Sequence, residues 1–195
     1  MRTHIYIIIL IVLFSCDNKE KSLTRDVDFF PNETSQYHGT RKIMDLNVKF
    51  SECGEWGGHE ENIFITTQSD ENFYLHYQKY CVDCDNMVLI EDSIGSYYAP
   101  FKKLIDSCTV IMNESHKNSI YKFSHNLLSA KFREKFPGHA GNRFYLKKYK
   151  GFSGDGFCIR FYGFDSKLVN DYNEFIKELD LPHSDTDNDI EGCDN

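Results

Sequence analysis

The chain lacks the excess of positive charge that a general nucleic-acid binder needs. Its 195 residues include 22 Lys and Arg against 30 Asp and Glu, which gives a formal net charge of −8. Because a nucleic-acid-binding face must replace condensed counterions with basic side chains, this balance argues against nucleic acid as a partner. The chain also lacks an internal repeat, and its 16 Phe and 12 Tyr favour one domain with a substantial core.

The N-terminus lacks an apolar run long enough to cross a bilayer, which takes about 20 residues. The run Ile5–Phe14 follows the basic Arg2 and has instead the length of the apolar region of a secretory signal peptide. The end of this run, Leu13-Phe14-Ser15-Cys16, resembles the lipobox of bacterial lipoproteins, in which an aliphatic residue and a small residue precede a lipidated cysteine. An ordinary signal peptide or a buried strand is the alternative.

The lipobox resemblance implies a location. It implies that Met1–Ser15 is removed, that Cys16 carries diacylglycerol and palmitate, and that the protein is anchored in an inner or outer membrane of the bacterial cell envelope. Several acyl chains together anchor stably, because each buried CH₂ contributes about 0.8 kcal/mol. We therefore expect a lipid-anchored protein on the periplasmic face of a membrane or on the cell surface.

Composition divides the chain into four segments. Residues 1–15 are the predicted lipoprotein signal peptide, 16–40 the lipidated cysteine and a flexible tether, 41–181 a globular domain, and 182–195 an acidic disordered tail. In the tail, Asp185, Asp187 and Asp189 resemble the start of calcium-binding loops of EF-hands and thrombospondin type 3 repeats. Ile190 stands where such loops carry a turn glycine, so a disordered tail rather than a metal site is the prediction.

Hydrophobic periodicity predicts an α+β fold. Alternation of apolar and polar residues predicts strands at Ile43–Phe50 and Phe73–Tyr80. The β-branched run Ile63–Thr67 predicts a strand between them, and a short fourth strand begins at Met87. Short connections between them favour an antiparallel meander. Two further strands, at Phe144–Tyr149 and Phe157–Tyr162, form a C-terminal pair. The expected architecture is this antiparallel sheet packed with two or three helices.

Each of the expected helices is predicted by a different sequence pattern. The first would begin at Pro100 and use Phe101, Leu104, Ile105 and Cys108 at helical spacing. The second would lie between Ser119 and Phe136, with Ile120, Phe123, Leu127 and Phe132 on one face. The last would be capped by Asp165 or Ser166 and would bury one stripe of side chains. That stripe consists of Leu168, Tyr172, Phe175, Ile176 and Leu179.

The stretch Ser51-Glu-Cys-Gly-Glu-Trp-Gly-Gly-His-Glu-Glu-Asn62 contains the only Trp of the chain, Trp56, between Cys53 and His59. The glycines of this stretch, Gly54, Gly57 and Gly58, supply the positive φ angles that a hairpin loop needs, so a structural loop is the main prediction. The alternatives are a ligand-binding loop around Trp56, or a small envelope hydrolase with Cys53 as nucleophile and His59 as base. The surrounding glutamates would raise the pKa of the thiol, which disfavours a nucleophile.

The remaining cysteines allow several chemistries. Cys81 and Cys84 form a Cys-x-x-Cys pair, but acidic neighbours and a following strand disfavour a thioredoxin-like redox site. With Cys53 and His59 they could instead bind zinc. Six cysteines follow Cys16, and an even number in an exported protein favours one or two disulfides. We predict disulfides, with no metal and no cofactor.

A basic stretch interrupts the otherwise acidic chain. Between Lys131 and Lys150, seven Lys and Arg residues are opposed only by Glu134. They could form a face for an acidic partner protein, a phosphate group or the membrane surface, or could simply be solvated side chains. The candidate binding residues are Trp56, Arg133, His139, Arg143, Lys147 and Lys148. We therefore predict a lipid-anchored envelope protein that acts by binding rather than by catalysis, with an envelope protein as its partner.

Overall fold

The computed structural model describes residues 29–30, 40–54, 58–68, 70, 72–93, 95–135, 140–149 and 156–182. Several residues singled out from the sequence lie outside these ranges, so nothing is said of their structure. They are Cys16, Trp56, His139, Asp185, Asp187 and Asp189.

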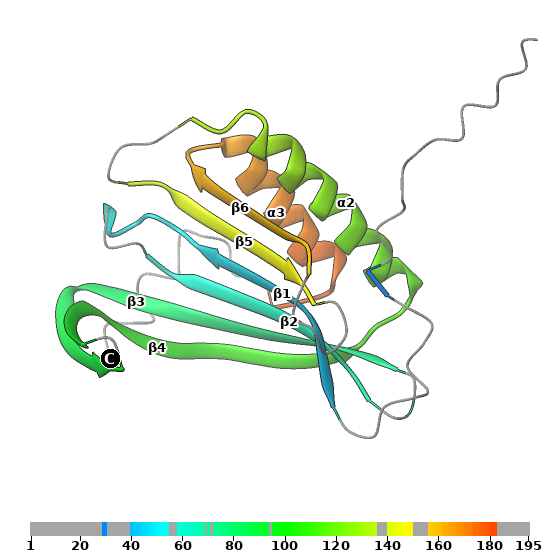
Figure 1. The fold of residues 1–195 in the computed structure, drawn as a ribbon, viewed down its shortest axis with the longest axis horizontal. Coiled ribbons are helices and arrows are strands. Elements are labelled where there is room, and N and C mark those ends of the chain that lie inside the picture. The colour runs from blue at the N-terminus through cyan, green and yellow to red at the C-terminus, as the bar shows by residue number, and fades with distance from the viewer. Residues whose placement is uncertain are drawn as a thin grey trace, which may run out of the picture.

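The described residues form a six-stranded antiparallel sheet and two helices (Figure 1). The strands are β1 (Arg41–Lys49), β2 (Glu60–Thr67), β3 (Phe73–Asp92), β4 (Gly95–Ile111), β5 (Asn142–Lys148) and β6 (Cys158–Gly163). The helices are α2 (Glu114–Lys131) and α3 (Ser166–Glu178). The strand order is β4-β3-β2-β1-β5-β6. The predicted α+β class with an antiparallel sheet is therefore confirmed, although the arrangement of its elements differs in detail.

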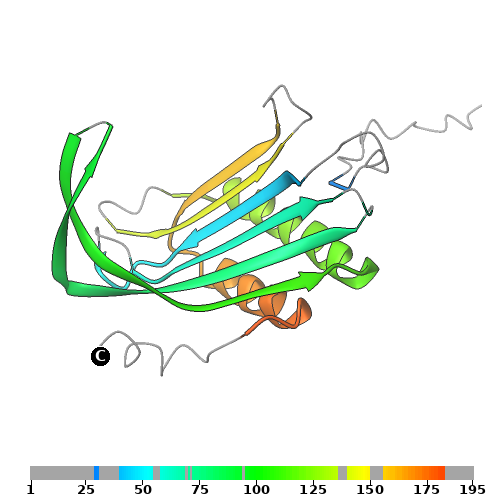
Figure 2. The same ribbon diagram turned by 90° about the horizontal axis from the view of Figure 1, so that it is seen from below.

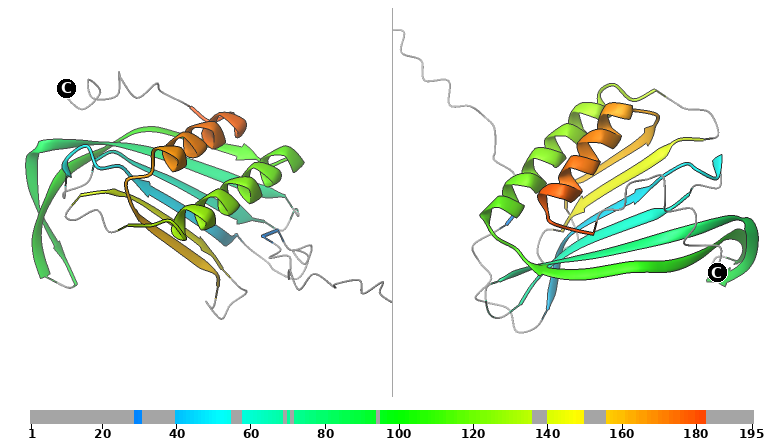
Figure 3. Two further views of the ribbon diagram at one scale, coloured as in Figure 1. Left: turned by 90° about the horizontal axis from the view of Figure 1, so that it is seen from above. Right: turned by 180° about the vertical axis from the view of Figure 1, so that it is seen from behind.

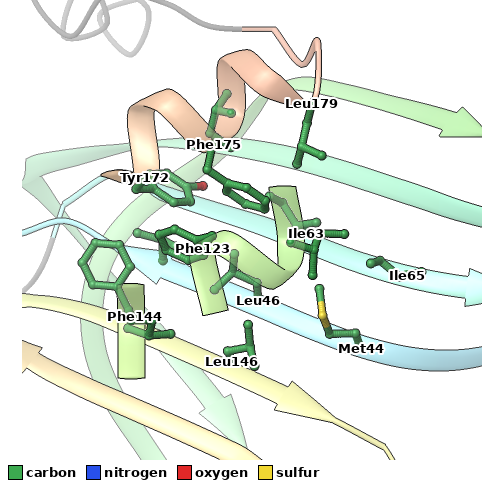
Figure 4. Close-up of a cluster of buried hydrophobic side chains, with 14 of the residues drawn as sticks. Met44, Leu46, Ile63, Ile65, Phe123, Phe144, Leu146, Tyr172, Phe175 and Leu179 are labelled. Atoms are coloured by element: carbon green, nitrogen blue, oxygen red, sulfur yellow. The ribbon is translucent and has the colours of Figure 1, made fainter. Parts of the chain in front are cut away.

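Both helices pack on one face of the sheet, which we call the covered face (Figure 3). Asn113 caps α2 and Asp165 caps α3, each by accepting a hydrogen bond from the third residue of its helix. Figure 4 shows Phe123 of α2 with Tyr172 and Phe175 of α3, packed over strand side chains. The predicted stripe of the last helix is confirmed, since all five of its side chains are buried.

The helix predicted from Pro100 is wrong. Residues Gly95–Ile111 form β4, which pairs with β3 along its whole length. Phe101 and Leu104 have helical spacing, but they form no buried stripe, because their exposed fractions are 39% and 45%. The spacing alone therefore did not indicate a helix. Pro100 lies opposite Met87, next to an irregularity in the register, where a strand tolerates proline. The strand predicted from Met87 is accordingly the far part of the 20-residue β3.

The second helix is present, but both ends are displaced from the prediction. It begins at Glu114 after its Asn113 cap and ends at Lys131. Phe132, expected on its buried face, follows the helix and is 85% exposed.

β3 and β4 extend beyond the rest of the sheet. The last pair between β2 and β3 is Glu60 with Tyr80, so the later residues of β3 pair only with β4. We call residues 81–103 the ribbon. In Figure 2 the ribbon extends past the end of the sheet and turns from the β3–β4 edge toward the side on which β5 and β6 lie.

Candidate functional site

The face of the sheet opposite the helices, which we call the open face, carries polar and aromatic side chains. Strand alternation places the apolar residues of β1 under the helices and turns the intervening residues to this face. Its central part is contributed by β1, β2, β5 and β6. These residues are Asp45, Asn47, Lys49, Glu60, Asn62, Phe64, Arg143, Tyr145, Lys147, Arg160 and Tyr162.

The middle of the open face is held by side-chain contacts between neighbouring strands. Asn47 donates a hydrogen bond of 2.5 Å to Asn62, its direct partner on β2. His76 stacks on Phe64 with ring centroids 4.6 Å apart, and its two ring nitrogens hydrogen-bond the hydroxyls of Thr66 and Thr109 at 2.9 and 3.0 Å. These cross-strand contacts leave the face ordered and rich in polar groups.

The two carboxylates among these residues are already paired with cations. Asp45 forms an ion pair of 2.5 Å with Lys42 and accepts a hydrogen bond from the Tyr149 hydroxyl, which raises the pKa of Tyr149 to about 12. Glu60 pairs with Lys49 at 3.3 Å and also with Lys102. Asp45 lies opposite Lys147 in the strand register, but neither carboxylate forms an ion pair with the cations at the β5–β6 end of the face.

Three cations at that end lie over tyrosine rings. Arg143 lies 5.1 Å from the ring centroid of Tyr162, Arg160 lies 5.1 Å from that of Tyr145, and Lys147 lies 4.5 Å from that of Tyr149. In the described part of the chain, no carboxylate lies within ion-pair distance of these three cations. We call these six residues the β5–β6 patch. The rings hold the cations in place, and Arg160 also hydrogen-bonds Tyr145 and Cys158, so that the three positive charges stay on the surface without a carboxylate partner.

The basic stretch predicted from the sequence is therefore divided by the fold. Arg143 and Lys147 lie in the β5–β6 patch, but Lys148 follows Lys147 on β5 and so alternates away from it. Arg133 lies just after α2, where it pairs with Asp165 at 3.2 Å. Sequence analysis missed Arg160, because only the pairing of β5 with β6 brings it beside Tyr145.

Cys53 forms a disulfide with Cys84, with the Cα atoms 5.3 Å apart. The bridge joins the loop after β1 to the start of the ribbon. Cys81 is also disulfide-bonded, whereas Cys108 and Cys158 are free thiols. In this state neither Cys53 nor the Cys-x-x-Cys pair offers the thiolate that a nucleophile or a zinc ligand requires.

His59 lies between two glutamates at the edge of the covered face. Its Nδ1 is 2.5 Å from Glu52 Oε1 and its Nε2 is 3.7 Å from Glu61 Oε1, while its ring stacks on Phe50 at 4.1 Å. Burial alone would lower the pKa of His59, but the contacts with Glu52 and Glu61 outweigh it and raise the pKa to about 9. The imidazole is therefore protonated at neutral pH, which is the wrong state for a general base.

The contacts around His59 continue into the core. Glu61 accepts a hydrogen bond of 2.7 Å from the Tyr172 hydroxyl and lies 4.0 Å from the buried Lys79 Nζ. Burial raises the pKa of Glu61, but hydrogen bonds from His59 and Tyr172 exceed this effect and lower it overall. We call Glu52, His59, Glu61, Lys79 and Tyr172 the ion cluster. Each of its charges has an opposite charge beside it, which is how a protein interior accommodates ionised groups.

The glycines of the loop have distinct roles. Gly54 has a φ of +64°, as the hairpin prediction required. Gly58 does not have a positive φ and is needed for space instead, because a Cβ there would lie 1.7 Å from Glu52 Oε2. Gly57 lies outside the described residues.

Comparison with protein-family models, curated proteins and solved structures found no match for this chain. Neither described helix is long and apolar enough to span a membrane. Within the described ranges, no group of three or more His, Cys, Asp or Glu side chains is arranged to hold a metal ion.

Proposed function

We propose that this chain is a lipid-anchored protein of the bacterial cell envelope that binds an acidic protein partner through its open face. The observation that supports this most directly is the β5–β6 patch, where three cations without carboxylate partners lie over tyrosine rings. The chain as a whole has a net charge of −8, so this concentration of positive charge is local.

The chemistry of the patch favours carboxylates on a protein surface. Arginine presents a planar fork of N–H donors that matches a carboxylate, and tyrosine contributes an apolar ring together with a polar hydroxyl. Arginine and tyrosine are enriched at protein interfaces for these reasons. Because Arg143 and Arg160 are exposed and held over rings, little side-chain freedom would be lost on binding.

The ion cluster and the disulfide weigh against the hydrolase alternative. Cys53 lacks a free thiol while it is bonded to Cys84, and a protonated His59 cannot accept a proton from a nucleophile. Both groups have a structural explanation in the described contacts, so binding remains the better-supported proposal.

Binding to an acidic polypeptide tests the proposal. We expect the full chain to bind poly-L-glutamate, with an affinity that falls as salt screens the charges. Replacing the three patch cations with glutamine (Arg143→Gln, Lys147→Gln, Arg160→Gln) should weaken binding at least about tenfold, a change of about 1.4 kcal/mol.

A matched control removes the same charge from the helices. Lys122, Lys131 and Lys167 each pair with a carboxylate on the helical side, and the variant Lys122→Gln, Lys131→Gln, Lys167→Gln should keep the affinity within about twofold. Equal losses in the two variants would show that only net charge matters and would contradict a specific patch.

The anchoring proposal has its own test. Intact mass spectrometry of the membrane-extracted protein should show a chain that begins at Cys16 and carries acyl groups. A Cys16→Ser variant should lose this modification and shift from the membrane fraction to the soluble fraction. Retention of Met1–Ser15 in the mature protein would refute lipidation.

A further inference from the structure

The ribbon exposes large apolar side chains that the rest of the described fold does not cover. Tyr98 is 64% exposed, Leu89 is 51% exposed and Tyr97 is 50% exposed. Leu89 pairs with Tyr98 across the two strands, and Ile90 pairs with Tyr97, so the apolar residues occupy both sides of the ribbon. A two-stranded ribbon cannot bury both of its sides by itself, and isolated hairpins are marginally stable in water.

The ribbon is nevertheless fastened where it leaves the sheet. Cys84 is bonded to Cys53, and Cys81, which is 3% exposed, is also in a disulfide. The Cys53–Cys84 bridge ties the ribbon to the loop after β1 and restricts how this segment can move relative to the sheet. A restricted binding element loses less conformational entropy on association than a free one.

The charge of the ribbon's outer part indicates what would cover it. Residues 86–101 include Glu91 and Asp92 but no Lys or Arg. Glu91 is exposed and, two residues along β3, lies on the same side of the ribbon as Leu89. Burying this side in lipid would bring a carboxylate into an apolar medium at high cost. The complementary surface is one that offers aromatic rings beside cations.

This chain contains such a surface. We propose that the ribbon of one copy binds the β5–β6 patch of a second copy. Exposed Tyr and Leu side chains would cover the tyrosines of the patch, and Glu91 would meet Arg143 and Arg160, which have no carboxylate partner among the described residues. The inference depends on the proposed function, because it names the acidic partner of the same patch as a second copy of the chain.

Within one chain the described ribbon does not cover the patch, because Tyr98, Leu89 and Tyr97 remain exposed. The ribbon extends from β3 and β4 at one edge of the sheet, and the patch lies on β5 and β6 at the other edge. Because two different surfaces meet, the association is head-to-tail, and each copy can bind one neighbour through its ribbon and another through its patch.

Co-purification of two differently tagged full chains from the same cells tests this geometry. A ribbon variant (Leu89→Ser, Tyr98→Ser) should lose association with itself at least about tenfold, and so should the patch variant (Arg143→Gln, Lys147→Gln, Arg160→Gln). A mixture of the two variants should regain association, because the intact ribbon of one binds the intact patch of the other. The regained association also shows that both variants are folded. The helix control (Lys122→Gln, Lys131→Gln, Lys167→Gln) should associate as the unmodified chain does.

Other outcomes overturn the inference. A patch variant that still associates with itself, with no recovery in the mixture, would indicate a ribbon-to-ribbon contact. Copies that do not co-purify at all would refute self-association. If the unmodified chain then still binds poly-L-glutamate through the patch, the proposed function stands, but the partner is not a second copy. Loss of poly-L-glutamate binding to the unmodified chain would instead refute the proposed function itself.

Discussion

The same strands form both faces of the sheet, but different interactions stabilise the side chains on each face. On the covered face, side chains such as Leu46, Val48 and Ile65 are at most 1% exposed and pack against two helices. On the open face, the intervening residues pair by hydrogen bonds, ion pairs and cation–ring contacts. Apolar burial contributes most of the free energy of folding, so the covered face specifies the fold, whereas the open face can vary and is available for recognition.

The ion cluster is the exception on the covered face. Glu61 and Lys79 are buried there, but each has an opposite charge within 4.0 Å, and Tyr172 adds a hydrogen bond. In the described part of the chain, no buried side-chain nitrogen or oxygen lacks a hydrogen-bond partner. The covered face therefore has an apolar part under both helices and a charged end beside the loop.

The two faces should differ most in the free energy of unfolding that is lost when one aromatic ring is removed from each face. Phe123 is 2% exposed and stacks on Phe175 with centroids 4.7 Å apart. Phe123→Ala should lower the free energy of unfolding by about 3–5 kcal/mol, because it leaves a cavity in the core. Tyr145→Ala on the open face should cost about 1 kcal/mol or less. Denaturant unfolding measures both changes, and similar losses would contradict the division into two faces.

The Cys53–Cys84 disulfide lies at the root of the ribbon and should have the next largest effect. The two cysteines are 31 residues apart, and opening a loop of this length should lower the free energy of unfolding by about 3–4 kcal/mol. Cys53→Ser with Cys84→Ser tests this by chemical unfolding. The matched control, Cys108→Ser with Cys158→Ser, removes two free thiols and should cost much less. Equal losses would mean that the bridge contributes no more than two ordinary thiols.

The ion cluster should make stability depend on pH. The pKa of His59 is about 9 in the folded chain against an ordinary 6.5, so its contribution is complete below pH 6.5 and is lost as pH rises through about 9. The lowered pKa of Glu61 acts in the other direction, and its contribution is lost as pH falls below the ordinary value of 4.5. The two contributions are therefore largest together between pH 4.5 and 6.5.

Unfolding measured from pH 6 to 10 should show a loss on the order of 2 kcal/mol from His59. A His59→Gln variant should be less stable at pH 6 and should lose most of this pH dependence. An unchanged slope in that variant would assign the pH dependence to other groups.

Sequence patterns predicted the elements that are covered on one side. Asp165 as a cap and the stripe from Leu168 to Leu179 identified α3, because a helix against a sheet must place its apolar residues at helical spacing. Strict alternation identified β1, β5 and β6 for the same reason. Each of these patterns arises because only one side of the helix or strand is buried.

The stretch from residue 82 to residue 111 could not be predicted in this way, because none of its described side chains is buried. Apolar residues occur on both sides of it, so alternation is lost and Phe101, Leu104 and Ile105 match helical spacing by coincidence. The β5–β6 patch was found only in part for a different reason. Arg160 and Tyr145 are 15 positions apart, and their contact depends on a strand register that composition does not determine.

Hydroxyl-radical footprinting of the full chain, with and without poly-L-glutamate, tests the central claim most directly. The account predicts that oxidation of Tyr145 and Tyr162 on the open face slows at least about twofold when the acidic polypeptide binds. Phe132, which is 85% exposed just after α2, should be oxidised at an unchanged rate and serves as the internal reference. Protection at Phe132 with none at Tyr145 or Tyr162 would contradict the assignment of binding to the open face.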